Sequence, residues 1–207
     1  MSEDPTVTQP ETVLEGAAVR LRPVRVEDLD HVISLISDSS LAQVRAVPRA
    51  PVTREEEKQW LASRPPNERR LTIETLQGDY LGAAGLHGID FVDRNAEVGM
   101  VIAEERNWGK GYGGEALQLL VRLAFRSLGL HRVYLRVHAY NERALRLYQR
   151  AGFSREGVDR EAHFYRGRWH DVVRMALLAP DESVPRTDDS PKLATPSGIP
   201  INCASPR

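Results

Sequence analysis

Four glycines among the six residues from Gly109 to Gly114 form the feature that most restricts how this chain can fold. They belong to the segment Arg106–Gly114, which follows an apolar strand-like run and precedes a stripe of apolar residues at helical spacing. Glycine lets a backbone approach a ligand closely, and the free amides at the start of a helix attract anions. Because Arg106 and Lys110 add positive charge, the segment predicts a pyrophosphate site, with a flexible strand-to-helix turn as the alternative.

The spacing of these glycines excludes two familiar nucleotide-binding motifs. It does not match G-x-x-x-x-G-K-[ST], so a P-loop is excluded. It also differs from a G-x-G-x-x-G motif followed by an acidic residue about 20 positions later, so a dinucleotide-binding fold is not expected.

The remaining sequence alternates strand-like and helix-like segments, which indicates an α/β fold. Apolar residues recur at every second position in the strands and at every third or fourth position in the helices. Thr53 and Glu56 form a capping box at the start of one helix, and Asn141 caps another. The predicted strands are 19–24, 71–76, 80–85, 96–103, 133–139, 161–165 and 171–178, and the predicted helices are 27–36, 53–64, 116–128 and 141–151.

The length and composition favour one folded domain with two polar ends. A chain of 207 residues suits a single domain, which we expect to span residues 17–179. Residues 1–16 are rich in Thr, Pro and Glu, and residues 180–207 are rich in Pro, Ser and Asp, so we expect both ends to be disordered. For the C-terminal end, the alternative is a segment that binds a partner or packs on the domain.

Charge and cysteine content exclude several classes of function. A net charge of −1 argues against a general nucleic-acid binder. No apolar run approaches ~20 residues, so a membrane span is not expected. The N-terminus is too acidic for a secretory signal, and the single Cys203 allows neither an internal disulfide nor a zinc site. We therefore expect a cytoplasmic protein without a metal site.

A second motif, Asn141–Phe153, follows the glycine-rich segment with the pattern N-x-x-A-x-x-x-Y-x-x-x-G-F. Together the two motifs resemble those of the GCN5-related N-acetyltransferases, whose Arg/Gln-x-x-Gly-x-Gly/Ala signature is matched from Arg106 to Gly111. The strand Ala96–Gly99 is similar too, and the resemblance covers about residues 18–178. The segment Tyr165–Met175 looks like the subgroups that acetylate ribosomal-protein N-termini and spermidine.

This resemblance implies a mixed, mostly antiparallel central sheet that is flanked by helices and splayed between the strand of Glu97 and the strand of Val133. Acetyl-CoA is expected in the cleft of that splay, as a co-substrate and without a metal. The residues that the resemblance assigns to CoA binding are Met100, Val101, Ile102, Arg106, Trp108, Gly109, Lys110, Gly111, Tyr112, Gly113, Gly114, Asn141 and Tyr148.

The resemblance also assigns the acid and the base. Tyr148 is expected to protonate the departing CoA thiolate as general acid, and the alternative is that it only packs in the core. Glu97 is expected to deprotonate the amine directly or through water, and the alternative is a salt bridge at the end of its strand. His87, Asp90 and His138 are further candidates for the base.

The expected function is acetyl transfer from acetyl-CoA to a primary amine by direct attack in a ternary complex. The acceptor is a protein N-terminus, a polyamine or another small amine. We expect neither a nucleic acid nor a membrane as partner, and a homodimer is compatible with the sequence. The alternative is a CoA-binding or sensing module that has lost turnover. The run Glu55–Glu57 indicates a solvated helix start or a site that attracts a cationic acceptor, and no motif in residues 37–52 or 87–95 identifies that acceptor.

Overall fold

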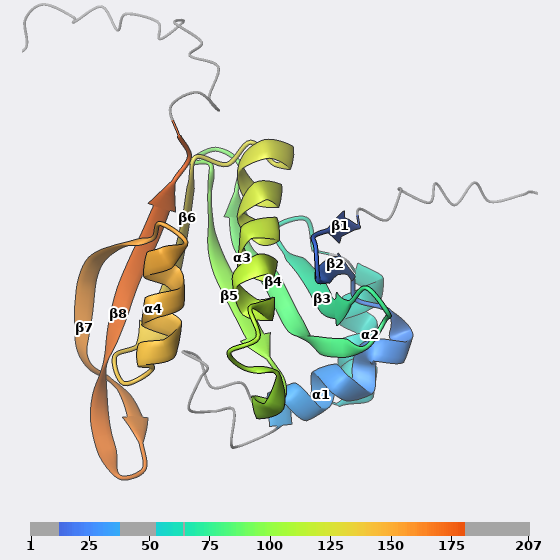
Figure 1. Cartoon of the computed structure of the whole chain (residues 1–207), viewed down its shortest axis with the longest axis horizontal. Helices are drawn as coiled ribbons and strands as arrows, with labels where there is room; N and C mark the ends of the chain where they lie inside the picture. The colour runs from blue at the N-terminus through green and yellow to red at the C-terminus, as the bar shows by residue number, and fades with distance from the viewer. Residues whose placement is uncertain (1–12, 38–52, 64, 181–207) are drawn as a thin grey trace, which may run out of the picture.

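The computed structural model describes residues 13–37, 53–63 and 65–180, and within them one sheet has the strand order β1-β2-β3-β4-β5-β6-β8-β7 (Figure 1). Neighbouring strands are antiparallel except for β5 and β6, which are parallel. The strands are β1 (Leu14–Glu15), β2 (Val19–Pro23), β3 (Arg69–Thr75), β4 (Tyr80–Asp90), β5 (Asn95–Ile102), β6 (Arg132–His138), β7 (Ser154–Tyr165) and β8 (Arg168–Leu178). The helices are α1 (Leu29–Ser37), α2 (Arg54–Ser63), α3 (Tyr112–Arg122) and α4 (Glu142–Arg150), with short helical turns η1 (Val26–Asp28), η3 (Glu105–Asn107) and η4 (Leu123–Ser127).

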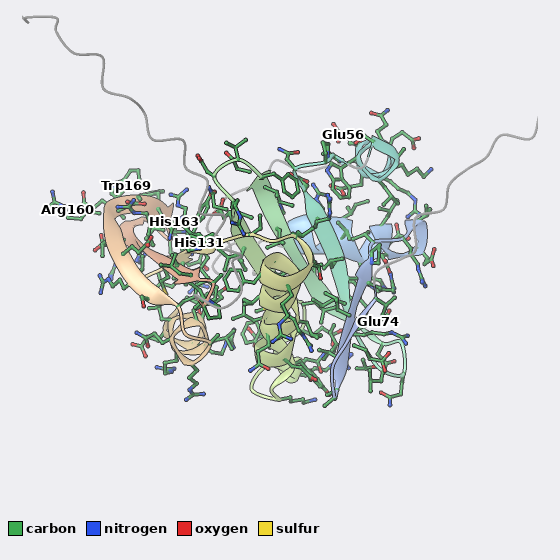
Figure 2. All side chains as sticks on the ribbon, turned by 90° about the horizontal axis from the view of Figure 1, so that it is seen from above. Glu56, Glu74, His131, Arg160, His163 and Trp169 are labelled. Atoms are coloured by element: carbon green, nitrogen blue, oxygen red, sulfur yellow. The ribbon has the colours of Figure 1, made fainter. Side chains whose placement is uncertain are left out.

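The predicted α/β fold with a mixed, mostly antiparallel sheet is confirmed. Viewed from above, α3 and α4 lie on one face of the sheet, whereas α2, marked by Glu56, lies on the other face (Figure 2). The apolar stripe of α3 packs on the sheet through Ala116, Leu117 and Leu120, all of which are fully buried. None of the helices in the described ranges is long and apolar enough to cross a membrane.

The largest departures from the predicted strands concern β1, β4 and β7. Leu14 and Glu15 form β1 and pair with β2, so the end of the segment 1–16 is ordered, contrary to expectation. Strand β4 continues past Gly85 to Asp90, because its second half pairs with β5 in spite of two glycines. Strand β7 begins at Ser154 rather than at 161, and its polar first half lacks the apolar alternation that would have revealed a strand. Residues 38–52 and 181–207 lie outside the described residues.

The parallel pair β5–β6 is short, and this shortness creates the opening in the sheet. Its register contains only Asn95↔Arg132, Ala96↔Val133 and Glu97↔Tyr134. Beyond Glu97, β5 pairs only with β4, and the remainder of β6 pairs with β8, so the two strands diverge (Figure 1). The predicted splay is therefore present between the strand of Glu97 and the strand of Val133.

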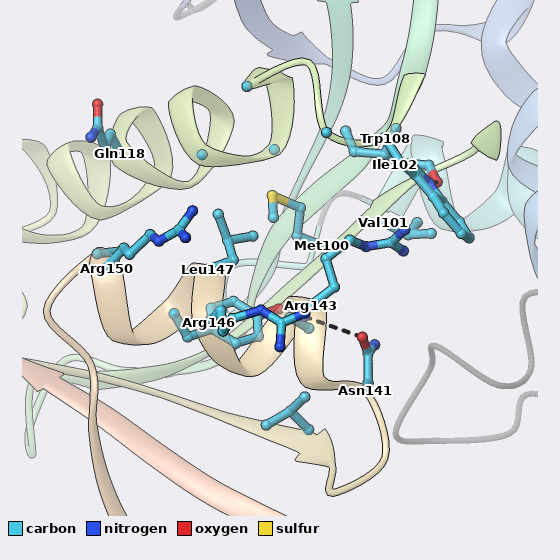
Figure 3. A pocket seen from close by; sticks show the side chains of 18 of the residues that line it. Met100, Val101, Ile102, Trp108, Gln118, Asn141, Arg143, Arg146, Leu147 and Arg150 are labelled. Carbon is cyan, nitrogen blue, oxygen red and sulfur yellow. Dashed lines mark hydrogen bonds between the residues drawn. The ribbon is translucent and has the colours of Figure 1, made fainter. Parts of the chain in front are cut away.

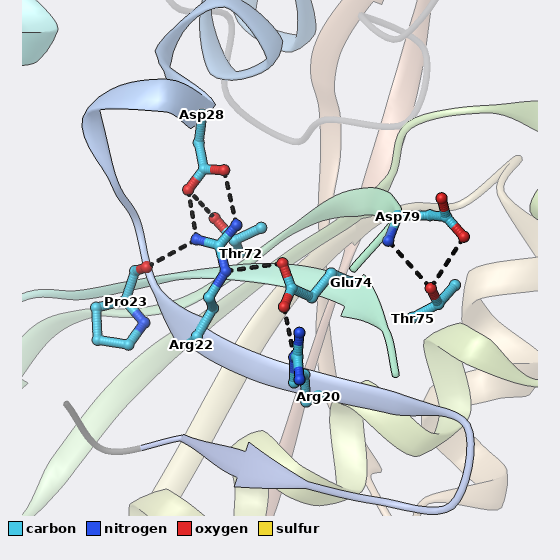
Figure 4. A network of polar contacts seen from close by, with 8 residues as sticks. All are labelled: Arg20, Arg22, Pro23, Asp28, Thr72, Glu74, Thr75 and Asp79. Atoms are coloured by element: carbon cyan, nitrogen blue, oxygen red, sulfur yellow. Dashed lines mark hydrogen bonds and ion pairs between the residues drawn. The ribbon is translucent and has the colours of Figure 1, made fainter. Parts of the chain in front are cut away.

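A buried ion-pair network holds β2, β3 and η1 together (Figure 4). Arg22 donates two hydrogen bonds to Asp28, at 2.6 and 2.9 Å, and one to Glu74, at 2.7 Å. The Thr72 hydroxyl donates a further hydrogen bond to Asp28 at 2.9 Å, and Arg20 binds the other oxygen of Glu74. Since the partners satisfy each other, the charges can be buried without a net excess of either sign.

Candidate active site

A cavity of about 420 Å³ opens where β5 and β6 separate (Figure 3). Its walls come from the end of β5, the glycine-rich loop, the first two turns of α3, the end of β6 and one face of α4. The predicted CoA-binding residues that line it are Met100, Val101, Ile102, Trp108, Gly109, Gly111, Gly113, Gly114, Asn141 and Tyr148.

The glycine-rich loop turns the chain so that the first amides of α3 are free. Gly109 and Gly111 have φ angles of 78° and 91°, in the left-handed region that favours glycine. Gly111 is the N-cap of α3, and the first intrahelical hydrogen bond is donated by Glu115 to the Gly111 carbonyl. The amides of Gly113 and Gly114 therefore precede the helical ladder at the rim of the cavity, as an anion cradle requires.

Four predicted site residues are not among those that line the cavity: Glu97, Arg106, Lys110 and Tyr112. Arg106 lies on η3, where its side chain is 79% exposed and pairs with Glu104. Lys110 contacts the Asn107 side chain at 3.5 Å. The two predicted basic residues of the loop thus contact loop neighbours and are not among the residues that line the cavity.

Positive charge inside the cavity comes from arginines that the motif analysis did not single out. Arg143, Arg146 and Arg150 extend from α4 along the cavity, and Arg136 of β6 lines it as well (Figure 3). The spacing i, i+3, i+7 places the three α4 residues on one helix face, and that spacing was readable in the sequence. None of the described residues that line this cavity is acidic, so the cavity suits an anion.

A contact between Trp108 and Arg143 connects the glycine-rich loop with α4. The Arg143 guanidinium lies 3.5 Å from the centre of the Trp108 ring, within cation–π distance. The Trp108 indole also donates a hydrogen bond to the Ile102 carbonyl at 3.0 Å. Burial lowers the pKa of Arg143, which nevertheless keeps its charge at neutral pH. The contact therefore joins the two walls of the cavity.

Tyr148 and Asn141 occupy the cavity side of α4. Tyr148 is buried, lines the cavity and packs with its ring centre 5.8 Å from that of Phe153. It is therefore both a core residue and part of the cavity wall, and its predicted role as general acid stays a prediction. Burial raises the pKa of Tyr148 to about 12, so the phenol holds its proton at neutral pH. Asn141 caps α4, because its side-chain oxygen accepts the Ala144 amide at 3.2 Å.

The carboxylates of Glu97 and of the acidic run Glu55–Glu57 on α2 lie on the face of the sheet opposite α3 and α4. Glu97 pairs in register with His87 and Tyr134, at the last position before the splay. The prediction of a solvated run at Glu55–Glu57 is wrong for Glu57, which is buried and accepts a hydrogen bond from Arg70 at 2.8 Å. Glu56 forms the predicted capping box with Thr53.

Two of the further candidates for the base have structural partners. Asp90 accepts the amides of Val92 and Asp93 and so closes the turn between β4 and β5. His138 is 1% exposed, lies 2.8 Å from the Tyr140 hydroxyl through Nδ1 and stacks on His163 at 3.9 Å. Neither side chain is presented to the cavity. In the described ranges, no group of three or more His, Cys, Asp or Glu residues could hold a metal ion.

Comparisons with known proteins agree with this geometry. The family model described as "Acetyltransferase (GNAT) domain" matches residues 18–154. The spermidine N(1)-acetyltransferase of Escherichia coli K12 is 32% identical over 164 residues, which are 78% of this chain and 86% of that protein. The Vibrio cholerae enzyme of the same name is 37% identical over 111 residues, covering 54% of this chain and 64% of that protein.

Two further comparisons concern a solved structure and a second kind of acetyltransferase. The spermidine N-acetyltransferase from Vibrio cholerae in complex with CoA and spermine superposes with a TM-score of 0.71 at 29% identity, covering 77% of this chain and 95% of that chain. The putative ribosomal N-acetyltransferase YdaF of Bacillus subtilis is 38% identical over 101 residues, covering 49% of this chain and 55% of that protein.

Proposed function

The chain belongs to the GNAT family of acetyltransferases and is an acetyl-CoA-dependent N-acetyltransferase, and from this premise we propose that its acceptor is a polyamine of the spermidine class. Because the chain is an N-acetyltransferase of this family, the predicted alternative of a CoA-binding or sensing module that has lost turnover does not apply. The proposal rests on the structural similarity to the Vibrio cholerae enzyme in complex with CoA and spermine. This similarity covers 95% of that enzyme's chain.

The proposed place of acetyl-CoA is the cavity at the splay. Its pyrophosphate would lie against the amides of Gly113 and Gly114, with Arg146 and Arg150 nearby on α4. A volume of about 420 Å³ lies within the range of roughly 300–1,000 Å³ that is usual for small-molecule sites. The absence of acidic residues among the described lining residues supports an anionic ligand.

The splayed part of β5 offers backbone groups to the pantetheine arm of this co-substrate. Met100, Val101 and Ile102 pair with β4 on one side only, so the other edge of the strand faces the opening. Unpaired edge groups can donate to and accept from an amide-containing chain, as an added strand would. A backbone amide in this stretch can also stabilise the negative charge that develops on the thioester oxygen.

Tyr148 is the proposed general acid in this arrangement. The amine nitrogen forms a bond with the acetyl carbon while the carbon–sulfur bond breaks, and Tyr148 donates a proton to the departing thiolate. The raised pKa keeps the phenol protonated until the thiolate forms. The amine approaches from the opposite face of the sheet, where Glu97 and His87 are both available as proton acceptors.

A second acceptor, a protein N-terminus, is favoured by one observation. The similarity to the putative ribosomal N-acetyltransferase YdaF reaches 38% identity, although it covers about half of either chain. A polyamine differs from a peptide because it carries several ammonium groups separated by apolar spacers. The two acceptors can therefore be separated by the need for a second positive charge.

The test is a panel of amines in a thiol-release assay with acetyl-CoA. The panel contains spermidine, spermine, putrescine, peptides with N-terminal alanine or serine, and propylamine as a primary amine without a second ammonium group. We expect kcat/KM for spermidine to exceed that for propylamine and for the peptides by at least about tenfold, or 1.4 kcal/mol. Preference for a peptide would support the second acceptor, and turnover of none of these amines would contradict both.

A further inference from the structure

We infer that His87, with Glu68 beside it, is the group that accepts the proton of the incoming ammonium, in preference to the predicted Glu97. The inference rests on the proposed function, since it concerns the amine side of the same reaction. It is carried by the arrangement of His87, Glu68, Gly85 and Gly99 on the face of the sheet opposite α3 and α4.

Two glycines make room for the imidazole of His87. A Cβ atom at Gly85 would lie 3.2 Å from His87 Nε2, and a Cβ atom at Gly99 would lie 3.0 Å from it. The ring therefore occupies the space that two side chains would otherwise fill, and it reaches from β4 across to β5. Either glycine replaced by a larger residue would displace the imidazole from this position.

This position lies beside the opening of the cavity. Residues two apart on a strand share a face, so Glu97, Gly99 and Val101 face the same side of β5. Met100, Val101 and Ile102 line the cavity where β5 is no longer paired with β6, and Gly99, beside which Nε2 lies, immediately precedes them. Glu97 is one step further away, where β5 is still paired with β4 and β6 on both sides. The imidazole is thus the basic group nearer the place where the strands separate.

Glu68 contacts the other nitrogen of the ring. One oxygen of Glu68 lies 3.9 Å from His87 Nδ1, and its second oxygen accepts the Trp60 indole N–H at 3.0 Å. Arg70 lies 3.5 Å from that second oxygen and stacks on the Trp60 ring at 3.8 Å. At 3.9 Å this is an ion-pair distance and not a hydrogen bond, so Glu68 can stabilise the positive charge that the imidazole gains while Nε2 accepts the proton.

The charges around His87 favour a cation. Glu68 faces it from the loop before β3, and Glu97 faces it from β5 as its cross-strand neighbour. Arg70 of β3 faces the same side, and its charge is balanced by Glu57 of α2 at 2.8 Å as well as by Glu68. Tyr134 of β6 adjoins Glu97 in register. Arg132 and Arg136 share the face of Tyr134 on β6 and pair with Glu156 and Asp159. The three carboxylates around Arg70 therefore leave an excess of negative charge, which attracts the ammonium group before it is deprotonated.

The proton balance of the reaction then closes. The ammonium gives one proton to His87 Nε2, and the free amine forms the bond to the acetyl carbon as the carbon–sulfur bond breaks. Tyr148 protonates the thiolate, and the second proton lost by the nitrogen restores the phenol. His87 releases its proton to solvent, so the sum of the steps is an N-acetyl amide, CoA thiol and one proton.

The experiment compares pH–rate profiles of the full chain with acetyl-CoA and spermidine for the wild type, H87Q and H131Q. His131 is an exposed histidine in the turn before β6, so H131Q changes the same residue type away from the cavity. We expect H87Q to lower kcat by about 10²-fold or more and to remove the acidic limb of the profile, as loss of a general base does. H131Q should keep the wild-type kcat and the acidic limb. In H87Q, CoA affinity and melting temperature should remain unchanged.

Two further variants separate catalysis from packing. H87A leaves a gap beside Gly85 and Gly99, and added imidazole should restore a measurable part of its activity, which packing alone would not allow. E68Q should move the acidic limb to lower pH, because the carboxylate no longer stabilises the imidazolium. An H87Q profile like that of the wild type, or loss of the limb in E97Q alone, overturns the inference. If the wild type acetylates no amine, the proposed function fails, and this inference fails with it.

Discussion

Two clusters of arginines in this molecule differ in whether acidic partners neutralise their charge. In the first, Arg22 is buried between β2, β3 and η1 and is bound by Asp28 and Glu74 at 2.6 to 2.9 Å. In the second, the arginines of α4 line an open cavity whose described lining contains no acidic residue. The first set of charges is closed on itself, and the second set leaves an excess of positive charge facing a space.

The difference separates charges that hold the fold from charges that await a ligand. Removing one partner from a buried network leaves a charge without compensation, and this lowers the stability of the fold. Removing a cavity arginine that makes only an exposed ion pair, such as Arg146, relieves repulsion within the folded protein and mainly weakens the attraction of an anion. A change in the buried network should therefore alter the stability of the fold, and a change in the cavity should alter catalysis or CoA binding. The opposite result in either place would contradict this comparison.

The largest expected effect is that of Tyr148→Phe in the cavity. This change keeps the ring and its packing against Phe153 but removes the proton, so kcat should fall by about 10²–10⁴-fold. Affinity for CoA and the free energy of unfolding should stay nearly constant, as measured by calorimetry and by chemical denaturation. A variant with wild-type kcat would show that Tyr148 only packs in the core.

The pH profile sharpens this assignment. The donor is the neutral phenol, which is present below the pKa of Tyr148, and burial raises that pKa to about 12. Ionisation of Tyr148 should therefore cause no fall in kcat between pH 7 and pH 10. A fall in that range that is present in the wild type and absent in Tyr148→Phe would contradict the raised pKa.

The next effect concerns the closed network and should appear in stability. Asp28→Asn removes one carboxylate from the buried Arg22, and the free energy of unfolding should fall by about 3 kcal/mol at pH 7. Catalytic parameters measured well below the melting temperature should not change, because the network lies outside the cavity. A loss of CoA affinity without a loss of stability would reverse the comparison.

Lowering the pH should remove the difference in stability between the wild type and Asp28→Asn. Burial by itself would raise the pKa of Asp28, but hydrogen bonds from Arg22, the Arg25 amide and Thr72 outweigh it and hold the pKa below its usual value. A depressed pKa stabilises the fold above the usual value of 3.8, and this contribution is lost as the pH falls through the native value. Unfolding free energies of the wild type and Asp28→Asn should therefore converge below about pH 4.

A third effect, of intermediate size, concerns the glycine-rich loop. Gly111→Val forces a branched residue into a backbone with φ near 91° at the N-cap of α3, and CoA affinity should fall by more than about tenfold, or 1.4 kcal/mol. Gly129→Val is the matched control, because Gly129 also has a positive φ of 65° and open space around it, at the far end of the helical segment. Both variants should lose similar stability, and calorimetry should show weaker CoA binding only for Gly111→Val.

The cavity side of the site was readable in the sequence because it is encoded in two continuous segments. The glycine-rich loop and the motif Asn141–Phe153 each carry their own local signals, which are glycine spacing, an N-cap and a tyrosine at a fixed distance. The α/β fold followed from apolar periodicity in the same way. The direction of a long side chain such as Arg106 was not readable, because its choice between Glu104 and the cavity depends on the three-dimensional loop.

On the amine side, the sequence offered Glu97 and His87 as candidate bases, but the surroundings of His87 were not readable, because they are assembled from distant positions. Trp60, Glu68, His87 and Gly99 come from four separate elements or loops, and their contacts arise only when β3, β4 and β5 align in register. Glu57 illustrates the same limit, since its neighbours Glu55 and Glu56 suggested a solvated run although Arg70 buries it. Local patterns do not show which member of a charged run meets a partner from another strand.

The smallest expected effect is that of Arg146→Gln, which removes one of the α4 arginines that line the cavity. Arg146 lines the cavity and also pairs with Glu142 on the surface of α4 at 2.9 Å, an exposed pair worth only about 0.3–0.5 kcal/mol of stability. We expect the KM for acetyl-CoA to rise about three- to tenfold at low salt, with kcat and the melting temperature nearly unchanged. Arg122→Gln on α3 is the control, because Arg122 is exposed and does not line the cavity.

Ionic strength decides whether the effect of Arg146 is electrostatic. The Debye length falls from about 30 Å at 0.01 M salt to about 10 Å at 0.1 M, so attraction of a CoA phosphate weakens as salt is added. The KM of the wild type should therefore rise with salt, and the ratio between Arg146→Gln and wild type should shrink toward one. A ratio that stays constant with salt would show that Arg146 acts through packing of α4. An equal effect of Arg122→Gln would show that the whole surface charge, and not the open set in the cavity, attracts the co-substrate.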